Sequence, residues 1–421
     1  MTESIKDKVA IIGMGCPRWG ERWDTSLMDM IVEASDEALT DAGMERKDIQ
    51  AAWFGTYQSA YTGQPVAGAL QLPYLPVSRV ENACATGAET LRGSTFALIS
   101  KAYDLVLAIG AEKLKDYGYG GLGPAYPGEW NPVYGASVEI GGGPGRYALA
   151  ATRYFHRYGI SPKDGKRMLA KISVKSHYCG ARNPKAHLRR EVSVEDVVNA
   201  PMIAWPLGLF DCCGVTDGAA AAILCRAEDA KKYKPSGDYC LIKGFGVAIG
   251  PGWGKEDTRY DFTHWEETER AAKQIYEMGG IKDPRKELDM AEVHDCFSIS
   301  ELMCYEGLGL CEKGHAKEAI DAGTFFPPGQ PRLRELLGEK DPEKPLPREG
   351  EIPVNVSGGL KSFGHPIGAS GCREVKEIYD QILGRAQEPS RQLKNVKLGV
   401  THNQGGHPGI FMCGMTLLGA P

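Results

Sequence analysis

Val80-Glu81-Asn82-Ala83-Cys84-Ala85-Thr86-Gly87 is a segment in which the end of a short apolar strand runs into a cysteine. The residues that follow, 88–100, carry apolar side chains at helical spacing, so Cys84 stands just before a helix. Unpaired backbone N–H groups at a helix N-terminus favour a thiolate. The segment therefore predicts either a cysteine nucleophile or a buried structural cysteine, and by itself it leaves both interpretations open.

Around this segment, buried strands alternate with amphipathic helices. Strands are expected at residues 9–13 and 104–111, and residues 46–55 indicate a turn and a strand. Asp24-Thr25-Ser26 can cap a helix that follows the first strand. Strands that alternate with helices predict an α/β protein with a largely parallel sheet, covered by helices on both faces.

The second half of the chain repeats this scheme. A strand at 241–249 is followed by an amphipathic stretch at 266–278, and residues 285–294 resemble residues 46–55 in pattern. Residues 354–359 occupy the place of the Cys84 segment, and a helix (371–383) and a strand (396–401) follow. Four elements in the same order indicate an internal duplication. The predicted domains are an N-terminal half (1–114 and 210–238), an inserted loop domain (115–209) and a C-terminal half (239–421).

The insertion is longer than an ordinary connection, and such segments are usually functional when they are ordered. It opens with a Gly- and Tyr-rich stretch, 117–145, and continues with helical patterns at 146–158 and 167–176. It also holds a basic cluster consisting of Arg182, Lys185, His187, Arg189 and Arg190. A solvated surface is the simpler interpretation of this cluster, and phosphate binding is the alternative.

Composition excludes several classes of function. The chain has 421 residues and a net charge of −5 without a basic block, which argues against nucleic acid and membrane surfaces as partners. No apolar window of 18 residues occurs, and residues 1–8 are too polar for a signal peptide. Twelve cysteines occur without a C-x-x-C pair, so we expect no metal site and a reducing, cytoplasmic setting.

Three further stretches carry reactive side chains at predicted strand ends, where α/β sheets place active sites. In Val293-His294-Asp295-Cys296-Phe297-Ser298, the side chains of His294 and Cys296 can point the same way. In 357–371, glycines flank His365 and allow a ligand to approach the backbone, which makes Ser357, Gly358 and Gly359 candidates for cofactor binding. The third stretch, 402–409, reads as a glycine-rich turn after the last strand.

Taken in order, Asn82-Ala83-Cys84, His294-Asp295-Cys296-Phe297, Gly364-His365-Pro366 and His402-Asn403 resemble the thiolase superfamily, and the match spans essentially the whole chain. Each motif is weak alone, whereas the ordered set is specific. The resemblance implies the thiolase fold, a duplicated five-layer α-β-α-β-α sandwich with an inserted loop domain, usually assembled as a dimer or a tetramer of dimers.

The chain departs from the common thiolases at two places. They carry Asn-Glu-Ala-Phe where residues 294–297 stand, and they carry Cys-x-Gly where this chain has His402-Asn403-Gln404-Gly405. Both changes resemble the sterol-carrier-protein-X type of thiolase. In that branch Cys296 is implied to replace the missing acid/base, while Cys413 reads as part of a core strand.

The resemblance also implies roles for single residues. Cys84 is the expected nucleophile and His365 its base, and His294 and His365 would stabilise an enolate. His402, Asn403, Gln404 and Gly405 form the expected oxyanion loop, in which backbone N–H groups act together with that of Cys84. The reaction is thiolytic cleavage of a 3-oxoacyl-CoA or the reverse Claisen condensation. Coenzyme A (CoA) is then a substrate, and no permanently bound cofactor is expected.

The resemblance further implies a homodimer core and, because the chain has no zinc ribbon of its own, a small zinc-ribbon/OB-fold partner. The aromatic and glycine content of residues 117–134, with Trp205 and Phe210, suggests a roomy pocket and branched or aromatic substrates such as benzoylsuccinyl-CoA. Two alternatives stay open: a retro-aldolase acting on a 3-hydroxyacyl-CoA side chain, and a non-catalytic acyl-CoA-binding subunit. Retention of Cys84 and His365 argues against the first, and retention of all four motifs argues against the second.

Overall fold

The computed structural model describes residues 4–118, 142–251, 260–386 and 388–421 as a mixed α/β protein. A nine-stranded sheet has the order β3-β2-β4-β7-β1-β8-β11-β10-β9, and β5 and β6 form a separate pair. The strands are β1 Val9–Gly15, β2 Ala51–Gly55, β3 Val77–Val80, β4 Leu105–Glu112, β5 Met202–Ala204, β6 Leu207–Gly208, β7 Gly218–Arg226, β8 Cys240–Ile249, β9 Met290–Val293, β10 Leu398–His407 and β11 Ile410–Gly419.

The described residues also form α-helices. They are α1 Leu27–Ala42, α2 Gln64–Leu70, α3 Thr86–Ile99, α4 Gly142–Arg157, α5 Pro162–Ala181, α6 Val194–Val198, α7 Ala230–Tyr233, α8 Glu266–Gly279, α9 Pro284–Glu287, α10 Ser298–Gly307, α11 Ala316–Asp321, α12 Pro331–Leu336, α13 Gly359–Ser362 and α14 Ser370–Ile382. Within the described ranges, no helix is long and apolar enough to cross a membrane.

The strand order shows the internal duplication directly. From its outer edge, the N-terminal half runs β3-β2-β4-β7-β1, and the C-terminal half runs β9-β10-β11-β8. An isolated parallel bridge between Ala291 and Val354 adds the counterpart of β3 beyond β9. The two halves meet where β1 pairs with β8, through Ala10 with Leu241 and Ile11 with Cys240. The domain boundaries given above stay predictions.

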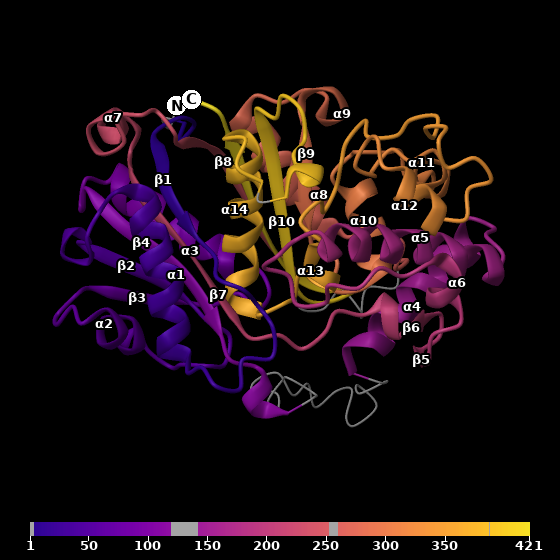
Figure 1. Ribbon diagram of the computed structural model, residues 1–421, viewed down its shortest axis with the longest axis horizontal. Coiled ribbons are helices and arrows are strands. Elements are labelled where there is room, and N and C mark those ends of the chain that lie inside the picture. Colours follow the sequence, from indigo (N-terminus) through magenta and orange to yellow (C-terminus); the bar gives the residue numbers. More distant parts are fainter. Residues whose placement is uncertain (1–3, 119–141, 252–259, 387) are drawn as a thin grey trace.

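Hydrophobic clusters define the five predicted layers. One cluster joins α1 to one face of the N-terminal strands, and a second joins α3 and α14 to strands of both halves. The third joins α8 and α10 to the outer face of the C-terminal strands and includes α4 and α5 of the insertion. In Figure 1, α14 lies between the indigo and the yellow strands, and α4–α6 lie beside α10–α12.

The prediction of a largely parallel sheet is wrong. Only the pairs β2–β3, β2–β4 and β9–β10 are parallel, while the five pairs from β4 through β7, β1, β8, β11 to β10 are antiparallel. Strands buried on both faces are continuous apolar runs, which carry no signal of direction. The predicted turn at 402–409 is likewise mostly strand, because β10 continues to His407 and turns into β11 at Pro408 and Gly409.

The two central helices touch backbone to backbone at their first turns. A Cβ on Gly87 of α3 would lie 2.6 Å from the backbone nitrogen of Gly371 in α14, and a Cβ on Gly371 would lie 2.8 Å from that of Ala88. Only glycine permits this approach. The contact brings the Cys84 segment of one half against the His365 segment of the other.

The basic cluster of the insertion forms ion pairs within the protein. Arg182 lies 2.8 Å from a carboxylate oxygen of Glu191, and Lys185 lies 2.8 Å from one of Glu37. These contacts favour an ordinary surface over phosphate binding. Most of the Gly- and Tyr-rich stretch falls outside the described residues.

His402 is buried in the middle of β10 and joins two helices on the outer face of the sheet. Its Nε2 lies 2.9 Å from the Thr268 hydroxyl of α8, and its Nδ1 lies 3.4 Å from the Cys304 sulfur of α10. Burial lowers the pKa of His402 to about 3. The imidazole of His402 is therefore neutral in the folded protein at neutral pH.

This burial predicts a pH-dependent contribution to stability. The unfolded chain binds a proton at His402 near pH ~6.5, whereas the folded chain does not until about pH 3. The contribution is fully present above about pH 6.5 and is lost as the pH falls toward 3, by about 2 kcal/mol between pH ~7 and pH ~5.

His402→Asn removes this titration. Near pH ~7, urea unfolding should give a lower free energy of unfolding for the variant than for the parent. The difference between these two free energies should be about 2 kcal/mol smaller near pH ~5. Buried carboxyl groups contribute to the pH dependence of stability with the opposite sign. They are the same in both proteins, so their contributions cancel in the difference. A gap that stays constant would contradict the assignment of a neutral His402.

Candidate active site

Three predicted site residues from different loops converge. The Cys84 sulfur and one ring nitrogen each of His294 and His365 all lie within 4.8 Å of one another. The two imidazole rings are 5.1 Å apart between centroids and nearly perpendicular. Cys84 comes from the N-terminal half and both histidines from the C-terminal half, so the cluster forms only when the duplicated halves pack together.

A tight turn between β3 and α3 holds Cys84. Ala83 has a φ of 47°, in the left-handed region. The Thr86 hydroxyl accepts a hydrogen bond from the Asn82 N–H at 2.8 Å and donates one to the Ala83 carbonyl at 2.5 Å. A Cβ on Gly405 would lie 2.6 Å from the Cys84 nitrogen, so the β10 backbone reaches Cys84 only because residue 405 is glycine.

Cys84 is half-buried, and its surroundings disfavour the thiolate that its position before a helix suggests. Burial raises the pKa of this thiol well above its ordinary value; a negative charge on Cys213 would raise it further, and those of Glu112 and Glu81 do so. The helix α3 begins only at Thr86, and its N-terminus does not outweigh the loss of solvation. Cys84 rests as a thiol.

Both histidines of the cluster are neutral and offer a ring nitrogen to a ligand. His365 Nδ1 lies 2.7 Å from the Ser370 hydroxyl, and burial together with the Arg373 charge lowers the pKa of His365 to about 3. Burial also lowers the pKa of His294 well below its usual range, and a proton on the neighbouring His365 or His402 would lower it further. His365 Nε2 and His294 Nδ1 are buried and find no hydrogen-bond partner in the described part of the chain.

Cys296 lies beside a thiol that the sequence did not single out. The Cys213 N–H donates to the Cys296 carbonyl at 2.8 Å, and Cys212 and Phe297 form an antiparallel bridge. Directly opposed residues in such a pair have Cβ atoms about 4.5–5.5 Å apart. Burial raises the pKa of Cys296, and ionisation of Cys213 or Cys84 would raise it further. No local pattern marks Cys213, because its contact joins segments far apart in the sequence.

The predicted oxyanion loop divides into separate parts. Of its members, Gly405 lies against Cys84, as described above. His402 faces α8 and α10, and Asn403 donates from Nδ2 to Glu374 Oε1 at 2.9 Å in the core. Because alternate residues of a strand point to opposite faces, the side chains of His402 and Asn403 are directed away from each other and into the interior. The oxyanion role expected of this loop rests on its backbone N–H groups and stays a prediction.

Ser357, Gly358 and Gly359 are buried in contacts within the protein. The Ser357 hydroxyl lies 2.5 Å from Glu292 Oε2, and a Cβ on Gly359 would lie 2.2 Å from Asp295 Oδ2. These contacts fix the loop beneath the site, so the predicted contact with CoA receives no support.

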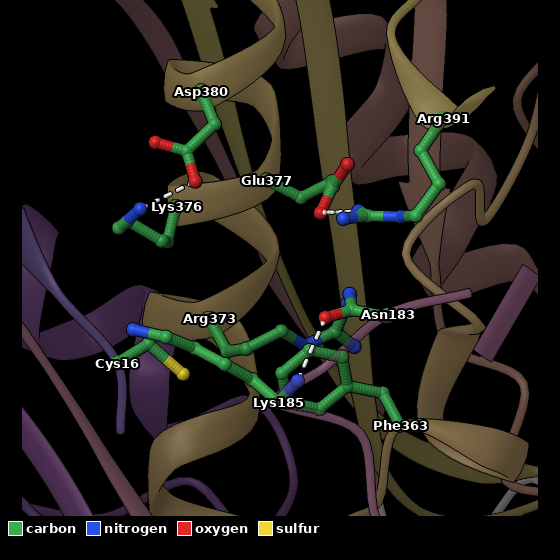
Figure 2. A pocket seen from close by; sticks show the side chains of 9 residues that line it. All are labelled: Cys16, Asn183, Lys185, Phe363, Arg373, Lys376, Glu377, Asp380 and Arg391. Carbon is green, nitrogen blue, oxygen red and sulfur yellow. Dashed lines mark hydrogen bonds and ion pairs between the residues drawn. The ribbon is translucent and has the colours of Figure 1, made fainter. Parts of the chain in front are cut away.

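A pocket lined largely by charged side chains lies along α14. Figure 2 shows it along α14, where Lys376 pairs with Asp380 and Glu377 pairs with Arg391. None of the predicted site residues lines it. Its charged groups stabilise one another, and we assign the chemistry to the cluster around Cys84.

Comparison with known proteins identifies the family. The family model described as "Thiolase C-terminal domain-like" matches residues 255–331 and 342–413. Acetyl-CoA acetyltransferase of Methanothermobacter thermautotrophicus is 36% identical over 95% of this chain and 97% of its own length. Benzoylsuccinyl-CoA thiolase subunit BbsB of Thauera aromatica is 31% identical over 96% of each chain. Rabbit (Oryctolagus cuniculus) sterol carrier protein 2 is 30% identical over 94% of this chain and 70% of its own length.

Solved structures show the same fold. The structure titled "Ltp2-ChsH2(DUF35) aldolase" superposes with a TM-score of 0.79 at 23% identity, covering 99% of this chain and 98% of that one. A monomeric SCP2-thiolase-like protein type 1 from Mycobacterium smegmatis superposes with a TM-score of 0.69 at 16% identity, covering 100% and 78%. The chain therefore belongs to the thiolase superfamily, in its sterol-carrier-protein-2-type branch, and is a thiolase-type acyltransferase.

Proposed function

We propose that the protein catalyses CoA-dependent thiolytic cleavage of a 3-oxoacyl-CoA, or the reverse Claisen condensation, through an acyl thioester on Cys84. One observation carries the proposal: the Cys84 sulfur lies within 4.8 Å of ring nitrogens of two neutral histidines. Among the residues that the structure describes, one ring nitrogen of each histidine has no hydrogen-bond partner. A thiol, a base and a donor for a developing oxyanion are the groups that acyl transfer needs.

The first half-reaction begins with a neutral site. As the Cys84 sulfur attacks the keto carbon, its proton passes to His365, which is neutral and therefore has a ring-nitrogen lone pair that can accept it. The bond between the α- and β-carbons then breaks, leaving an acyl thioester on Cys84 and the enolate of the departing acyl-CoA. The Cys296 thiol protonates that enolate and becomes a thiolate.

The second half-reaction reverses these proton transfers. The Cys296 thiolate takes the proton of the incoming CoA thiol, and the CoA sulfur attacks the thioester on Cys84. The tetrahedral intermediate collapses, Cys84 leaves, and His365 returns its proton. Both thiols and His365 end the cycle as they began it.

Negative charge develops on oxygen in each half-reaction. We assign the enolate oxygen to His294 and His365, and the tetrahedral oxygen to the backbone N–H groups of Cys84 and Gly405, whose backbones lie in contact. Loss of one such donor typically costs about 3–4 kcal/mol of transition-state stabilisation.

We propose an aromatic or branched 3-oxoacyl-CoA such as benzoylsuccinyl-CoA as the substrate, supported by the similarity to BbsB. The two described aromatic residues suggested for the pocket do not add to this support. Trp205 is 49% exposed on the β5–β6 pair, and Phe210 packs against His177. Acetoacetyl-CoA is the second substrate to test, because two archaeal relatives are named acetyl-CoA acetyltransferase.

A retro-aldolase acting without CoA is the alternative function, because a structurally similar protein is titled an aldolase. The cluster of Cys84, His294 and His365 favours the thiolase reaction, since a retro-aldol cleavage forms no thioester on the enzyme. The same cluster argues against a non-catalytic acyl-CoA-binding subunit.

We further propose a homodimer and a small zinc-ribbon/OB-fold partner. β3 is an edge strand of the sheet, and an open strand edge can pair with that of a second copy. A partner protein is supported by two names, that of BbsB as a subunit and that of the complex of Ltp2 with ChsH2.

Cys84 should become acylated. Mixing the protein with a 3-oxoacyl-CoA in the absence of CoA should add the acyl mass to the peptide that contains Cys84, as measured by mass spectrometry. Cys84→Ala should abolish the adduct and turnover. Cys311→Ala, which removes a half-buried thiol at a surface pocket, should leave both unchanged. Acylation of another cysteine, with Cys84 unmodified, would contradict the assignment.

Cys296 should matter far more than His402. Cys296→Ala leaves only a small void but removes the group that serves both half-reactions, so turnover and proton exchange at the α-carbon of acetyl-CoA should both fall about 10²–10⁴-fold. His402→Ala should cause a smaller loss, because this side chain lies outside the cluster.

The two variants are compared by turnover and by deuterium incorporation into acetyl-CoA. Near-normal rates for Cys296→Ala, together with abolished exchange in His402→Ala, would reverse the assignment of the acid/base.

A further inference from the structure

The Cys84 cluster has the composition of a metal site. A sulfur and two ring nitrogens, from Cys84, His294 and His365, lie within 4.8 Å of one another. In the described part of the chain, this is the one group of Cys, His, Asp or Glu side chains that brings three such ligand atoms together. Thiolate and imidazole are ligands that Zn²⁺ prefers, and a catalytic type of zinc site has three protein ligands and one open position.

The distances within the cluster suit an ion of this size. In a tetrahedral site with Zn–S bonds of about 2.3 Å and Zn–N bonds of about 2.0–2.1 Å, the ligand atoms lie about 3.3–3.6 Å apart. The three atoms of the cluster therefore need to approach one another by about 1.5 Å at most. Rotation of the Cys84 side chain and a small shift of either ring supply that movement without a change in the backbone.

The two histidines are prepared to bind a ligand. His365 Nε2 and His294 Nδ1 are buried and have no hydrogen-bond partner among the described residues. The other nitrogen of His365, Nδ1, lies 2.7 Å from the Ser370 hydroxyl, which donates its single proton to the Pro366 carbonyl at 3.1 Å. Nδ1 therefore carries the ring proton, and the lone pair lies on the unpartnered Nε2. Metal-binding histidines usually have such an outer hydrogen bond on the second nitrogen.

An ion can reach the cluster, and nearby charge favours a cation. Cys84 is half-buried, so its surroundings are open to solvent on one side. The Glu81 carboxylate accepts a hydrogen bond from the N–H of the residue before Cys84, which places a negative charge beside the sulfur. The Arg373 charge that acts on His365 is offset by an ion pair with Glu292 at 2.8 Å.

We propose that Cys84, His294 and His365 bind Zn²⁺, with water as the fourth ligand, and that the ion reversibly inhibits the enzyme. Binding breaks the S–H bond of Cys84. The sulfur electron pair coordinates the ion, the proton passes to solvent, and no atom is oxidised or reduced. Sequence spacing does not mark this site, because its ligands come from three separate segments, and the expectation of no metal site rested on the missing C-x-x-C pair.

Zinc binding and catalysis exclude each other because they use the same electron pairs. The Cys84 sulfur cannot attack a keto carbon while it is bound to the ion, and a coordinated His365 cannot accept a proton. The inhibition therefore rests on the proposed function, whereas the binding of the ion does not.

The binding test uses Co²⁺ as a spectroscopic substitute, because Zn²⁺ has a filled d shell and no colour of its own. Titration of the protein with Co²⁺ should produce the absorption bands of a tetrahedral ion with a thiolate ligand, and excess Zn²⁺ should remove them. Cys84→Ala should abolish the thiolate band. His294→Gln and Ser370→Ala should each weaken Zn²⁺ binding at least about 10-fold, since loss of an outer partner alone typically costs about 10–100-fold.

Cys311→Ala is the matched control. Cys311 and His315 line a surface pocket and offer the same two kinds of ligand outside the cluster. Removal of the Cys311 thiol should leave the Co²⁺ spectrum and the Zn²⁺ affinity unchanged.

Inhibition is measured as the acylation of Cys84 by a 3-oxoacyl-CoA in the absence of CoA, because the free CoA thiol would itself bind zinc. At a free Zn²⁺ concentration about 10-fold above its Kd, the acylation rate should fall about 10-fold. Alkylation of Cys84 by iodoacetamide should slow by the same factor, and EDTA should restore both rates.

A Co²⁺ complex without a thiolate band would overturn the inference, as would a band that survives Cys84→Ala or disappears with Cys311→Ala. Normal acylation at saturating Zn²⁺ would also overturn it, while leaving the proposed function intact. Protection of Cys84 from alkylation by Zn²⁺, in a protein that no 3-oxoacyl-CoA acylates, would refute the proposed function and leave the metal site standing.

Discussion

The contact between Gly87 and Gly371 is the constraint on which the site depends. Each glycine lies in the first turn of a central helix, and a side chain at either position would meet the backbone of the other helix within 3 Å. Because α3 and α14 touch in this way, the loop before one helix, with Cys84, meets the loop before the other, with His365. Duplication thus supplies two similar helix starts, and the glycines bring them together.

Loss of solvent sets the chemistry of the groups that meet there. Burial raises the pKa of Cys84 and Cys296 and lowers that of His294 and His365, so all four are neutral at rest. Charge then appears only during the reaction, where unpartnered ring nitrogens and backbone N–H groups are already in place. A preorganised neutral site stabilises such a charge more strongly than water does, because its donors need not reorient.

Much of the fold and the reactive cluster was predictable, because Cys84, His294 and His365 lie in short motifs whose order is specific. The direction of the central strands was not, because fully buried strands read alike in either direction. Cys213 was missed because its contact with Cys296 joins segments that lie far apart in the sequence. Residues 402–409 were interpreted as a turn, whereas most of them continue β10. The His402 side chain therefore points into the interior, toward α8 and α10.

The most direct test of a Cys84-based thiolase is product analysis of one 3-oxoacyl-CoA with and without free CoA. With CoA, the account predicts catalytic formation of two acyl-CoA products. Without it, a single turnover should release one acyl-CoA and retain the other acyl group on Cys84. Multiple turnovers in the absence of CoA, with release of a free carbonyl product and no acylated Cys84, would contradict the account and indicate a retro-aldol reaction.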